Sequence, residues 1–587
     1  MDFSRHQEKL PIALLLLVYF VLRCGYLDAV PRWDAATYWG AIAEAVEATN
    51  AITSISELPR VILNTYNVFG HSAMGYVGLI VIGQLFDYPN LFSLNFVHVL
   101  LTMLAVFCSY TIFRWFLPKR HQLPEAILAT ALFAMDPLFF ASSIFINTDF
   151  PALVFFMAAL ATLLYGHYGL FCIACLFMMF SKITGTLFWI GLVSGIGLHS
   201  TYVIYHAWRA RRLPGLGELL PPTNPMGINQ VLSLPVCIYR ITCILLPGVL
   251  FKLYSIIQQG AMWTMNNGIT FNSDGWNCFG FNPRVMSNRA AEIFILNFHW
   301  ILASIAIIGF FIAYGRFIER KKHTANKHTD PVDVQASATR EQFSYLAGRR
   351  WGLLPVATCF IIFVAFNLSY ITYIIPRYVV YGGFFLILFA ILALQFAVDS
   401  RKLRCIILAS TFSLFFLQTF RTIDPLSILF VGSTSFSDHK ILQIDSPGEA
   451  QGNGFVYNAE FTMEDKLLNR MQKAMPIKPE TIIITWNSDS GYSWFTRGDT
   501  FVNAETLERT IDTRNKFGYN IIDVKSLHSA IAPPEAYYVY MPWLAQFSNE
   551  EQELAHVRQF YQVSAAEDVG FQGYSLRLYR LTRHPQQ

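Results

Sequence analysis

The stretch FINTDFPALVFF, residues 145–156, places one carboxylate, that of Asp149, between two long apolar runs. Its neighbours in the sequence are Asn147, Thr148 and Pro151, and none of them is a cation. A charge this close to hydrocarbon is costly, so intramembrane carboxylates usually serve a function. The simpler alternative is a solvated Asp149 that caps a helix beginning at Pro151. The rest of the chain must decide between these two readings, and on which side of a membrane Asp149 lies.

The composition indicates a membrane protein. Of the 587 residues, 54% are hydrophobic and 14% are charged, and the mean hydropathy is +0.39, whereas soluble proteins carry about 25% charged residues. The net charge of +4 does not suggest a nucleic-acid partner. Eight of the nine cysteines lie in or beside apolar runs, and only Cys278 lies in a polar segment, so we do not expect disulfides to shape the fold. Cys172 and Cys175 have metal-like spacing, but no His or carboxylate lies beside them, so we assign no metal site there.

The first apolar run resembles a signal peptide because basic residues precede it. It lacks a small-x-small cleavage pattern, and Arg23 follows its apolar core. We therefore interpret it as a retained first membrane helix.

About eleven segments approach the roughly 20 apolar residues that a membrane span needs. They are 10–27, 92–117, 125–146, 150–166, 168–181, 183–206, 236–257, 291–314, 351–373, 378–398 and 404–421. The pieces 150–166 and 168–181 are short, which suits tilted helices or helices buried in a bundle.

Charge bias decides the role of the ambiguous apolar piece 71–86. If it lies along the interface rather than crossing, the basic clusters at 118–122, 209–212, 316–323 and 400–404 all fall on the inner side, together with Arg5 and Lys9. That arrangement obeys the positive-inside rule at every loop. It places the N-terminus inside, the C-terminus outside and Asp149 at the outer boundary.

Two further regions lie outside the membrane in this scheme. The first external loop contains an amphipathic pattern at 33–48, which predicts an interfacial helix. Residues 422–587 are polar, with strand-like runs at 481–486, 519–524, 536–543 and 573–581 and helical patterns at 459–474 and 548–562. We expect a membrane domain over 1–421 and a small external α/β domain over 422–587. The fold class is thus a polytopic α-helical membrane protein with an external α/β domain.

Four ionisable residues from distant positions share the outer boundary: Asp34, Asp149, Lys182 and Arg377. A capping role for Asp34 and snorkelling for Lys182 are the simpler alternatives for single residues. As a set, the cations suit a phosphate group and the carboxylates suit a general base. A phosphate at the membrane surface with an apolar tail is a lipid phosphate. Transfer of a sugar from a polyprenyl-phosphate donor would therefore explain both the cations and the carboxylates.

The order of these features resembles the polytopic GT-C glycosyltransferases. The features are an acidic first loop (RWDAATYWG, 32–40), a short helix opened by a histidine (GHSAMGYVGLI, 70–80), the stretch 132–156, the turn FSKITGTLFW (180–189) and PRYVVYGGFFLILF (376–389). The similar subgroup is the dolichyl-phosphate-mannose-protein mannosyltransferase-like and lipid A aminoarabinose transferase-like enzymes. The resemblance covers 1–210 and the 376–389 segment.

The resemblance implies Asp34 and Asp149 as catalytic acids and places Lys182, Arg377 and Tyr378 against the donor phosphate. Candidate substrate contacts are His71, Arg32, Trp33 and Tyr38. Relatives carry an Asp-Glu pair in the first loop, but here Ala35 follows Asp34, so the base role rests on Asp34 alone or is shared with Asp149. The two acids could share a divalent ion, but no further ligand is evident and no metal site is assigned.

The leading hypothesis is an inverting membrane glycosyltransferase that uses a polyprenyl-phosphate sugar, undecaprenyl- or dolichyl-linked, and a glycan, lipid or protein acceptor. We expect it in a bacterial inner membrane with a periplasmic site, or in the endoplasmic reticulum of a eukaryote. The alternatives are a transporter or flippase and a structural or assembly subunit. The sugar and the acceptor do not follow from the sequence.

Overall fold

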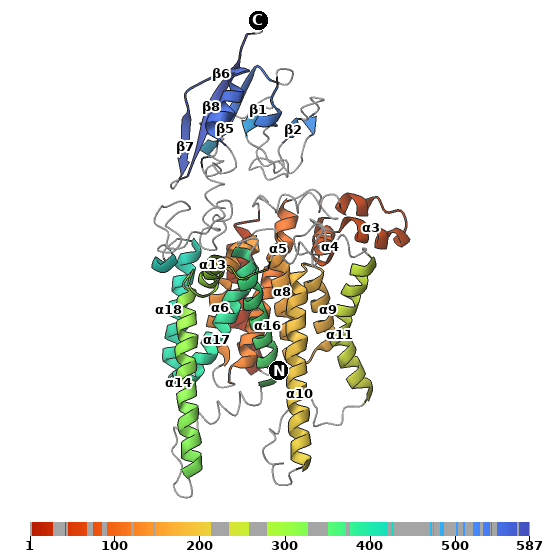
Figure 1. Ribbon diagram of the computed structural model, residues 1–587, viewed down its shortest axis with the longest axis vertical. Helices are drawn as coiled ribbons and strands as arrows, with labels where there is room; N and C mark the ends of the chain where they lie inside the picture. The colour runs from red at the N-terminus through yellow and green to blue at the C-terminus, as the bar shows by residue number, and fades with distance from the viewer. Residues whose placement is uncertain are drawn as a thin grey trace.

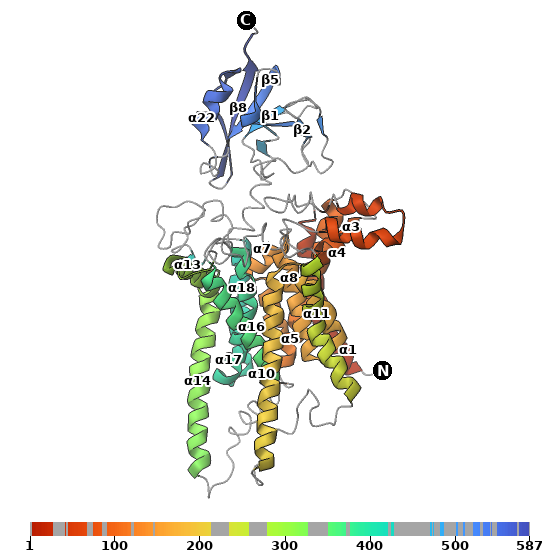
Figure 2. The same cartoon turned by 45° about the vertical axis from the view of Figure 1, so that its right-hand side comes forward.

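The computed structural model combines a bundle of helices with a separate β-sheet near the C-terminus (Figures 1 and 2). The structure describes residues 3–27, 42, 45–66, 74–84, 91–118, 122–144, 147–212, 234–257, 279–326, 350–370, 376–420, 424–427, 470–471, 473–474, 482–485, 500–502, 509–510, 520–528, 532–540, 542, 549–571 and 574–585.

Each of the eleven predicted spans corresponds to a helix or to a pair of helices. They are α1 (Phe3–Cys24), α5 (Leu91–Phe116), α6 (Gln122–Ala134) with α7 (Pro137–Ile144), α8 (Asp149–Leu164), α9 (Tyr168–Met179), α10 (Thr184–Arg212), α11 (Leu234–Ile257), α14 (His299–Asn326), α16 (Arg350–Ser369), α17 (Tyr381–Ala397) and α18 (Arg401–Phe420). Among the described residues, five helices are long and apolar enough to cross a membrane, namely α5, α11, α14, α16 and α18, and the α6–α7 pair makes a sixth if it counts as one span. The chain is therefore an integral membrane protein, while the full set of eleven spans remains a prediction.

Two predicted spans have different boundaries in the structure. The segment 125–146 is two helices that meet at an angle of 58°. Pro137 disfavours a helical conformation at Asp136, and the Asp136 carboxylate then caps α7 by accepting the N–H of Phe139 at 2.8 Å. The segment 291–314 is divided as well, because α13 (Pro283–Phe294) ends before α14 begins at His299.

The first external loop contains short helices. These are η1 (Ile55–Glu57), α3 (Leu58–Thr65) and α4 (Met74–Gln84). With 11 residues, α4 spans only about 17 Å and is too short to cross a bilayer, as expected for the piece 71–86. The predicted 33–48 helix lies mostly outside the described residues, although 42 and 45–50 are helical.

Two of the basic clusters of the sequence lie at one end of the bundle. Helices α10 and α14 extend away from the β-sheet (Figure 1), and their last turns contain the clusters 209–212 and 316–323. Arg316 of α14 bonds Asp399, just before α18, with a distance of 3.1 Å between Nη1 and Oδ1. We call this end of the bundle the inner end and the end nearer the sheet the outer end, in keeping with the charge bias.

The C-terminal sheet has the strand order β3-β2-β4-β1-β5-β8-β6, with β7 also paired to β8. Its strands are β1 (Ile482–Thr485), β2 (Thr500–Val502), β3 (Arg509–Thr510), β4 (Asn520–Asp523), β5 (Glu535–Tyr540), β6 (Tyr561–Val563), β7 (Glu567–Phe571) and β8 (Tyr574–Arg583). Strand β1 is parallel to β4 and β5, whereas β8 is antiparallel to β5, β6 and β7.

The four strands expected from the sequence are confirmed as β1, β4, β5 and β8. The helix predicted at 548–562 is shorter: α22 covers Glu550–Val557, and Tyr561 begins β6, where pairing with β8 overrides the helical pattern. The helix predicted at 459–474 lies outside the described residues, except for helical turns at 470–471 and 473–474. The domain boundary at residue 422 remains a prediction.

Candidate functional site

Asp149 and Lys182 form a buried ion pair at the outer end of the bundle. The Nζ atom of Lys182 lies 2.6 Å from both carboxylate oxygens of Asp149. The Lys182 side chain is only 6% exposed and the Asp149 side chain only 4%. The carboxylate that stands alone in the sequence thus meets a cation 33 residues further along the chain.

The capping role considered for Asp149 belongs to another residue. Helix α8 begins at Asp149, and the side-chain oxygen of Asn147 accepts the N–H of Phe150 at 2.8 Å. The Asp149 carboxylate is therefore available for Lys182, and its place in the first turn also suits the helix dipole. The alternative of a solvated Asp149 capping a helix at Pro151 is wrong, because the side chain is buried.

A tight turn between α9 and α10 positions Lys182. The N–H of Gly185 donates to the Lys182 carbonyl at 2.9 Å, which starts α10 immediately after the lysine. A Cβ atom at Gly185 would lie 2.4 Å from the Met178 carbonyl oxygen, so only glycine allows this approach. On the other side of the turn, the N–H of Gly75 in α4 donates to the Phe180 carbonyl at 2.8 Å. The short helix α4 is thereby fixed to the turn that carries Lys182.

An aromatic ring and a second ion pair lie beside Lys182. The ring of Tyr378, in η4 (Pro376–Val379), has its centroid 4.5 Å from Lys182 Nζ and 5.8 Å from the Arg289 guanidinium carbon. Arg289 Nη1 lies 2.8 Å from Glu292 Oε2, one turn along α13, and both side chains are buried. Lys182, in a turn, and Arg289, in α13, thus approach one ring from positions far apart in the sequence, and each is held by a carboxylate.

Arg289 and Glu292 were not predicted from the sequence. They lie in PRVMSNRAAEIF (283–294), at the edge of an external loop, where their spacing of three residues resembles an ordinary surface pair. The amphipathic pattern of this segment could have indicated a helix that packs against the bundle, but not that its charged pair is buried.

Several predicted site residues lie outside the described part of the chain. They are Asp34, Arg32, Trp33, Tyr38 and His71, together with the side chain of Arg377, of which the structure describes only the backbone in η4. Of the predicted set, the structure brings together Asp149, Lys182 and Tyr378. Within the described ranges, no group of three or more His, Cys, Asp or Glu side chains could hold a metal ion.

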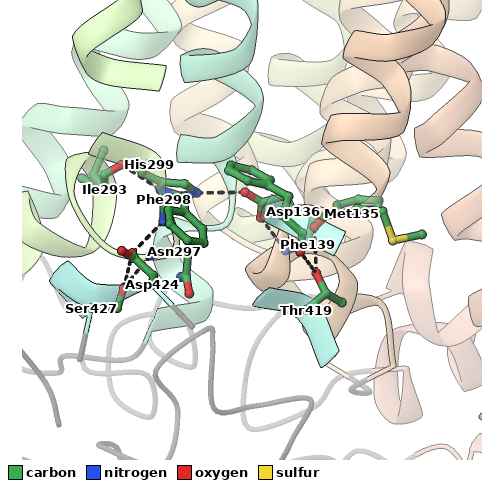
Figure 3. A network of polar contacts seen from close by, with 11 residues as sticks. Met135, Asp136, Phe139, Ile293, Asn297, Phe298, His299, Thr419, Asp424 and Ser427 are labelled. Atoms are coloured by element: carbon green, nitrogen blue, oxygen red, sulfur yellow. Dashed lines mark hydrogen bonds and ion pairs between the residues drawn. The ribbon is translucent and has the colours of Figure 1, made fainter. Parts of the chain in front are cut away.

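A second buried polar network lies at the outer end, where α6, α7, α14 and α18 meet (Figure 3). His299 Nδ1 faces the Ile293 carbonyl at 2.9 Å, and its Nε2 faces Asp136 Oδ2 at 2.8 Å. Because a carbonyl can only accept, Nδ1 carries a hydrogen, and the His299–Asp136 contact contains one further proton. The Asp136 carboxylate is already engaged with α7 and α14, so this network joins helices rather than presenting a free group.

The same network fixes an unusual turn before α14. Asn297 and Phe298 have φ angles of 59° and 62°, a left-handed conformation that is costly for a bulky residue such as Phe. Asp424 Oδ2 accepts the Phe298 N–H at 2.8 Å, and Ser427 Oγ accepts the Asn297 N–H at 2.8 Å (Figure 3). Residues just after α18 therefore stabilise the connection between α13, which carries Arg289, and α14.

Comparisons with known proteins find similar solved structures but no matching family. No protein-family model matches this chain, and no curated protein matches it. Among solved structures, the chain is similar to the crystal structure of ArnT from Cupriavidus metallidurans bound to undecaprenyl phosphate, with 14% identity, a TM-score of 0.44 and 97% of each chain covered. It is also similar to the apo structure of that protein, with 14% identity, a TM-score of 0.46 and 100% of each chain covered. These values do not assign the chain to a family.

Proposed function

We propose that this protein is a membrane glycosyltransferase that moves a sugar from a polyprenyl-phosphate donor to an acceptor on the outer face, with inversion at the anomeric carbon. The observation that carries the proposal is the buried Asp149–Lys182 pair at the outer helix ends, with Tyr378 and the Arg289–Glu292 pair beside it. The motif resemblance of residues 1–210 and 376–389 supports the same reading.

The chemistry of the two cations favours a lipid phosphate as ligand. Lys182 and Arg289 both approach the ring of Tyr378 at the outer end of an apolar bundle, which is the depth at which the headgroup of a lipid phosphate lies. Each cation has a carboxylate partner. A lysine has three N–H donors and an arginine has five, so each cation can contact a phosphate oxygen while keeping that carboxylate. Buried cations of this kind stabilise the negative charge that develops on a leaving phosphate.

The two acids are given different roles. Both carboxylate oxygens of Asp149 lie 2.6 Å from Lys182 Nζ, so this carboxylate is occupied in holding the lysine. We therefore assign Asp149 to positioning Lys182. The general base that takes the proton of the acceptor hydroxyl or amine is assigned to Asp34, on the strength of its place in the first loop.

A transporter remains the alternative class. Transporters use interrupted helices to carry charged groups, and the α6–α7 bend at Asp136 is such an interruption. The Asp136 carboxylate, however, is occupied by the α7 N-terminus and by His299, which favours a structural role for this bend.

The test is sugar transfer by the purified full chain in nanodiscs. Radiolabelled polyprenyl-phosphate sugars serve as donors, and envelope material from a strain lacking the protein serves as acceptor. We expect label in the acceptor and release of an equal amount of polyprenyl phosphate, and loss of both with Asp34→Asn or Lys182→Met. Substrate uptake into proteoliposomes without any sugar transfer would overturn the proposal in favour of a transporter. Full transfer by either folded variant would remove the role given to that residue.

A further inference from the structure

Arg23, in the last turn of α1, is a buried cation that lacks a carboxylate in the part of the chain that the structure describes. Its side chain is 1% exposed. Its Nη2 donates to the Ser143 carbonyl at 2.6 Å, but its Nε and Nη1 atoms have no hydrogen-bond partner among the described residues. Burying a guanidinium costs several kcal/mol unless it is compensated, so these donors call for an acceptor.

Arg23 differs in its partners from the other fully buried arginines. In the described ranges three arginines are fully buried, namely Arg23, Arg289 and Arg404. Arg289 pairs with Glu292 and Arg404 pairs with Glu125, with distances of 2.8 and 3.0 Å. Arg23 has only the Ser143 carbonyl and the rings of Tyr26 and Phe140, whose centroids lie 5.7 and 5.9 Å from its guanidinium carbon. Ring contacts supply part of the lost hydration, but they do not neutralise the charge.

Two further polar groups lie within electrostatic range of Arg23, namely the hydroxyl of Tyr19, one turn earlier on α1, and the ring of His98 on α5. Like Arg23, both interact with Ser143, Tyr19 with its side chain and His98 with its backbone. Both side chains are fully buried. His98 Nε2 bonds the Tyr76 hydroxyl, and when that hydroxyl donates to Nε2, the hydrogen of the neutral ring is at Nδ1. Tyr19, Arg23 and His98 then present three sets of donors and no acceptor that is negatively charged.

This group lies close to Asp149 but uses contacts other than those of Lys182. The His98 ring stacks on Phe150, the residue after Asp149, with centroids 5.7 Å apart and an angle of 22° between the planes. Ser143, which binds Arg23, lies in the last turn of α7, the helix before Asp149. The contacts of Lys182 and Arg289 with Tyr378 involve none of these residues.

We propose that Arg23, Tyr19 and His98 form a second oxyanion-binding site that takes a phosphate or carboxylate group of a bound substrate. The site uses residues other than Lys182 and Arg289, and the proposal holds whether or not the transferase function does. The oxyanion belongs either to the lipid donor or to the acceptor. Both sources offer the same chemistry, because several oxygen acceptors with a net negative charge satisfy the unused donors and neutralise Arg23.

The test measures the thermal stability of the full chain in nanodiscs of neutral lipid, with inorganic phosphate or a polyprenyl phosphate as probe. The variants are Arg23→Met, Tyr19→Phe and the double variant Asp149→Asn/Lys182→Met. We expect Arg23→Met to melt at or above the wild-type temperature without ligand, because a buried charge is removed. Its apparent affinity for inorganic phosphate should fall about tenfold to a hundredfold, as for loss of a charge-assisted contact. Tyr19→Phe, which keeps the ring and removes only the hydroxyl, should weaken phosphate binding less.

The double variant at the ion pair should keep the Arg23-dependent response to inorganic phosphate. If Arg23→Met also weakens binding of the polyprenyl phosphate, the donor supplies the oxyanion; if only inorganic phosphate is affected, the acceptor supplies it. An equal response of wild type and Arg23→Met to inorganic phosphate, including no response in either, would overturn the proposal. So would a lower melting temperature of ligand-free Arg23→Met combined with unchanged binding, since Arg23 would then be a structural cation.

Discussion

The two ends of the helical bundle each bury an ion pair, but they satisfy the charges differently. At the inner end, Glu125 Oε1 lies 3.0 Å from Arg404 Nη2, and the carboxylate also accepts from the Gln395 amide. Arg404 Nη1 donates to the carbonyls of Val398 and Asp399 at 2.6 and 3.2 Å. This network connects α6 with α18 and with the end of α17, and its partners are all backbone or side-chain groups of the bundle itself.

At the outer end, the charges gather where helices begin and end. Asp149 begins α8, Lys182 lies in the turn before α10, and Arg289 comes from α13, which packs against η4. Tyr378 lies within reach of both cations, and Arg23 adds a buried positive charge. A network that holds helices together needs balanced charges, whereas a binding site keeps donors that a ligand completes. Lys182 and Arg289 have carboxylate partners, as Arg404 does, so the difference between the two ends is Arg23. We propose from it that the inner pair stabilises the fold and that the outer group serves a ligand.

The largest effect is expected from the outer pair. Asp149→Asn or Lys182→Met alone leaves a buried charge without its partner and should lower stability by about 3–5 kcal/mol. The double variant Asp149→Asn/Lys182→Met should regain most of that stability, measured by thermal unfolding, and still transfer sugar at least about a hundredfold more slowly, as for loss of a group that stabilises transition-state charge. Recovery of transfer together with stability would show that the pair is only structural.

The inner pair provides the matched control. Glu125→Gln or Arg404→Met alone should also cost about 3–5 kcal/mol, for the same reason. The double variant Glu125→Gln/Arg404→Met should regain stability and, unlike its outer counterpart, transfer sugar at the wild-type rate once folded. A double variant that is stable but inactive would contradict the distinction between the two ends.

A smaller effect is expected from the turn that positions Lys182. In Gly185→Ala the new methyl group would meet the Met178 carbonyl oxygen, so the turn must shift at a cost of about 1–3 kcal/mol. We expect weaker donor binding, seen as a higher KM. Gly197→Ala in the same helix is the control: no atom lies within 4 Å of its Cβ position, so helix propensity should stabilise it by up to about 1 kcal/mol. Equal behaviour of the two variants would mean that the turn does not set the position of Lys182.

The smallest effect is expected from the ring beside Lys182. Tyr378→Leu removes the cation–π contact, worth about 0.5–2 kcal/mol, and should raise the donor KM by about twofold to thirtyfold. Tyr378→Phe keeps the ring and should stay close to wild type. If Tyr378→Phe raises the donor KM as much as Tyr378→Leu does, the hydroxyl rather than the ring face makes the important contact.

The helical segments and the main strands of the sheet were predictable because they depend on local pattern. Runs of apolar residues located the helices, and the short strand runs located β1, β4, β5 and β8. The break at Asp136–Pro137 was missed, although a residue before proline is a recognised signal. The short strands β2, β3, β6 and β7 were missed because their pairing with distant strands decides them.

The candidate site was predictable only in part. A carboxylate between two spans and a lysine in a turn could each be recognised as unusual, and their common depth followed from charge bias. That Asp149 and Lys182 bond each other could not be predicted, because either could equally have faced water or headgroups. Arg289 and Glu292 resembled a surface pair, and Arg23 resembled the polar end of a span.

Local composition was enough to show that this chain lies in a membrane and which segments are helical, because hydrophobic length is a local property; it also predicts, through charge bias, that the basic loops share one side. Which buried charges neutralise one another became visible only in the packed bundle. Pairing depends on side chains tens or hundreds of residues apart meeting within about 3 Å, and that is set by how the helices pack. In the packed bundle Asp149 contacts Lys182, whereas Arg23 has no carboxylate partner among the described residues.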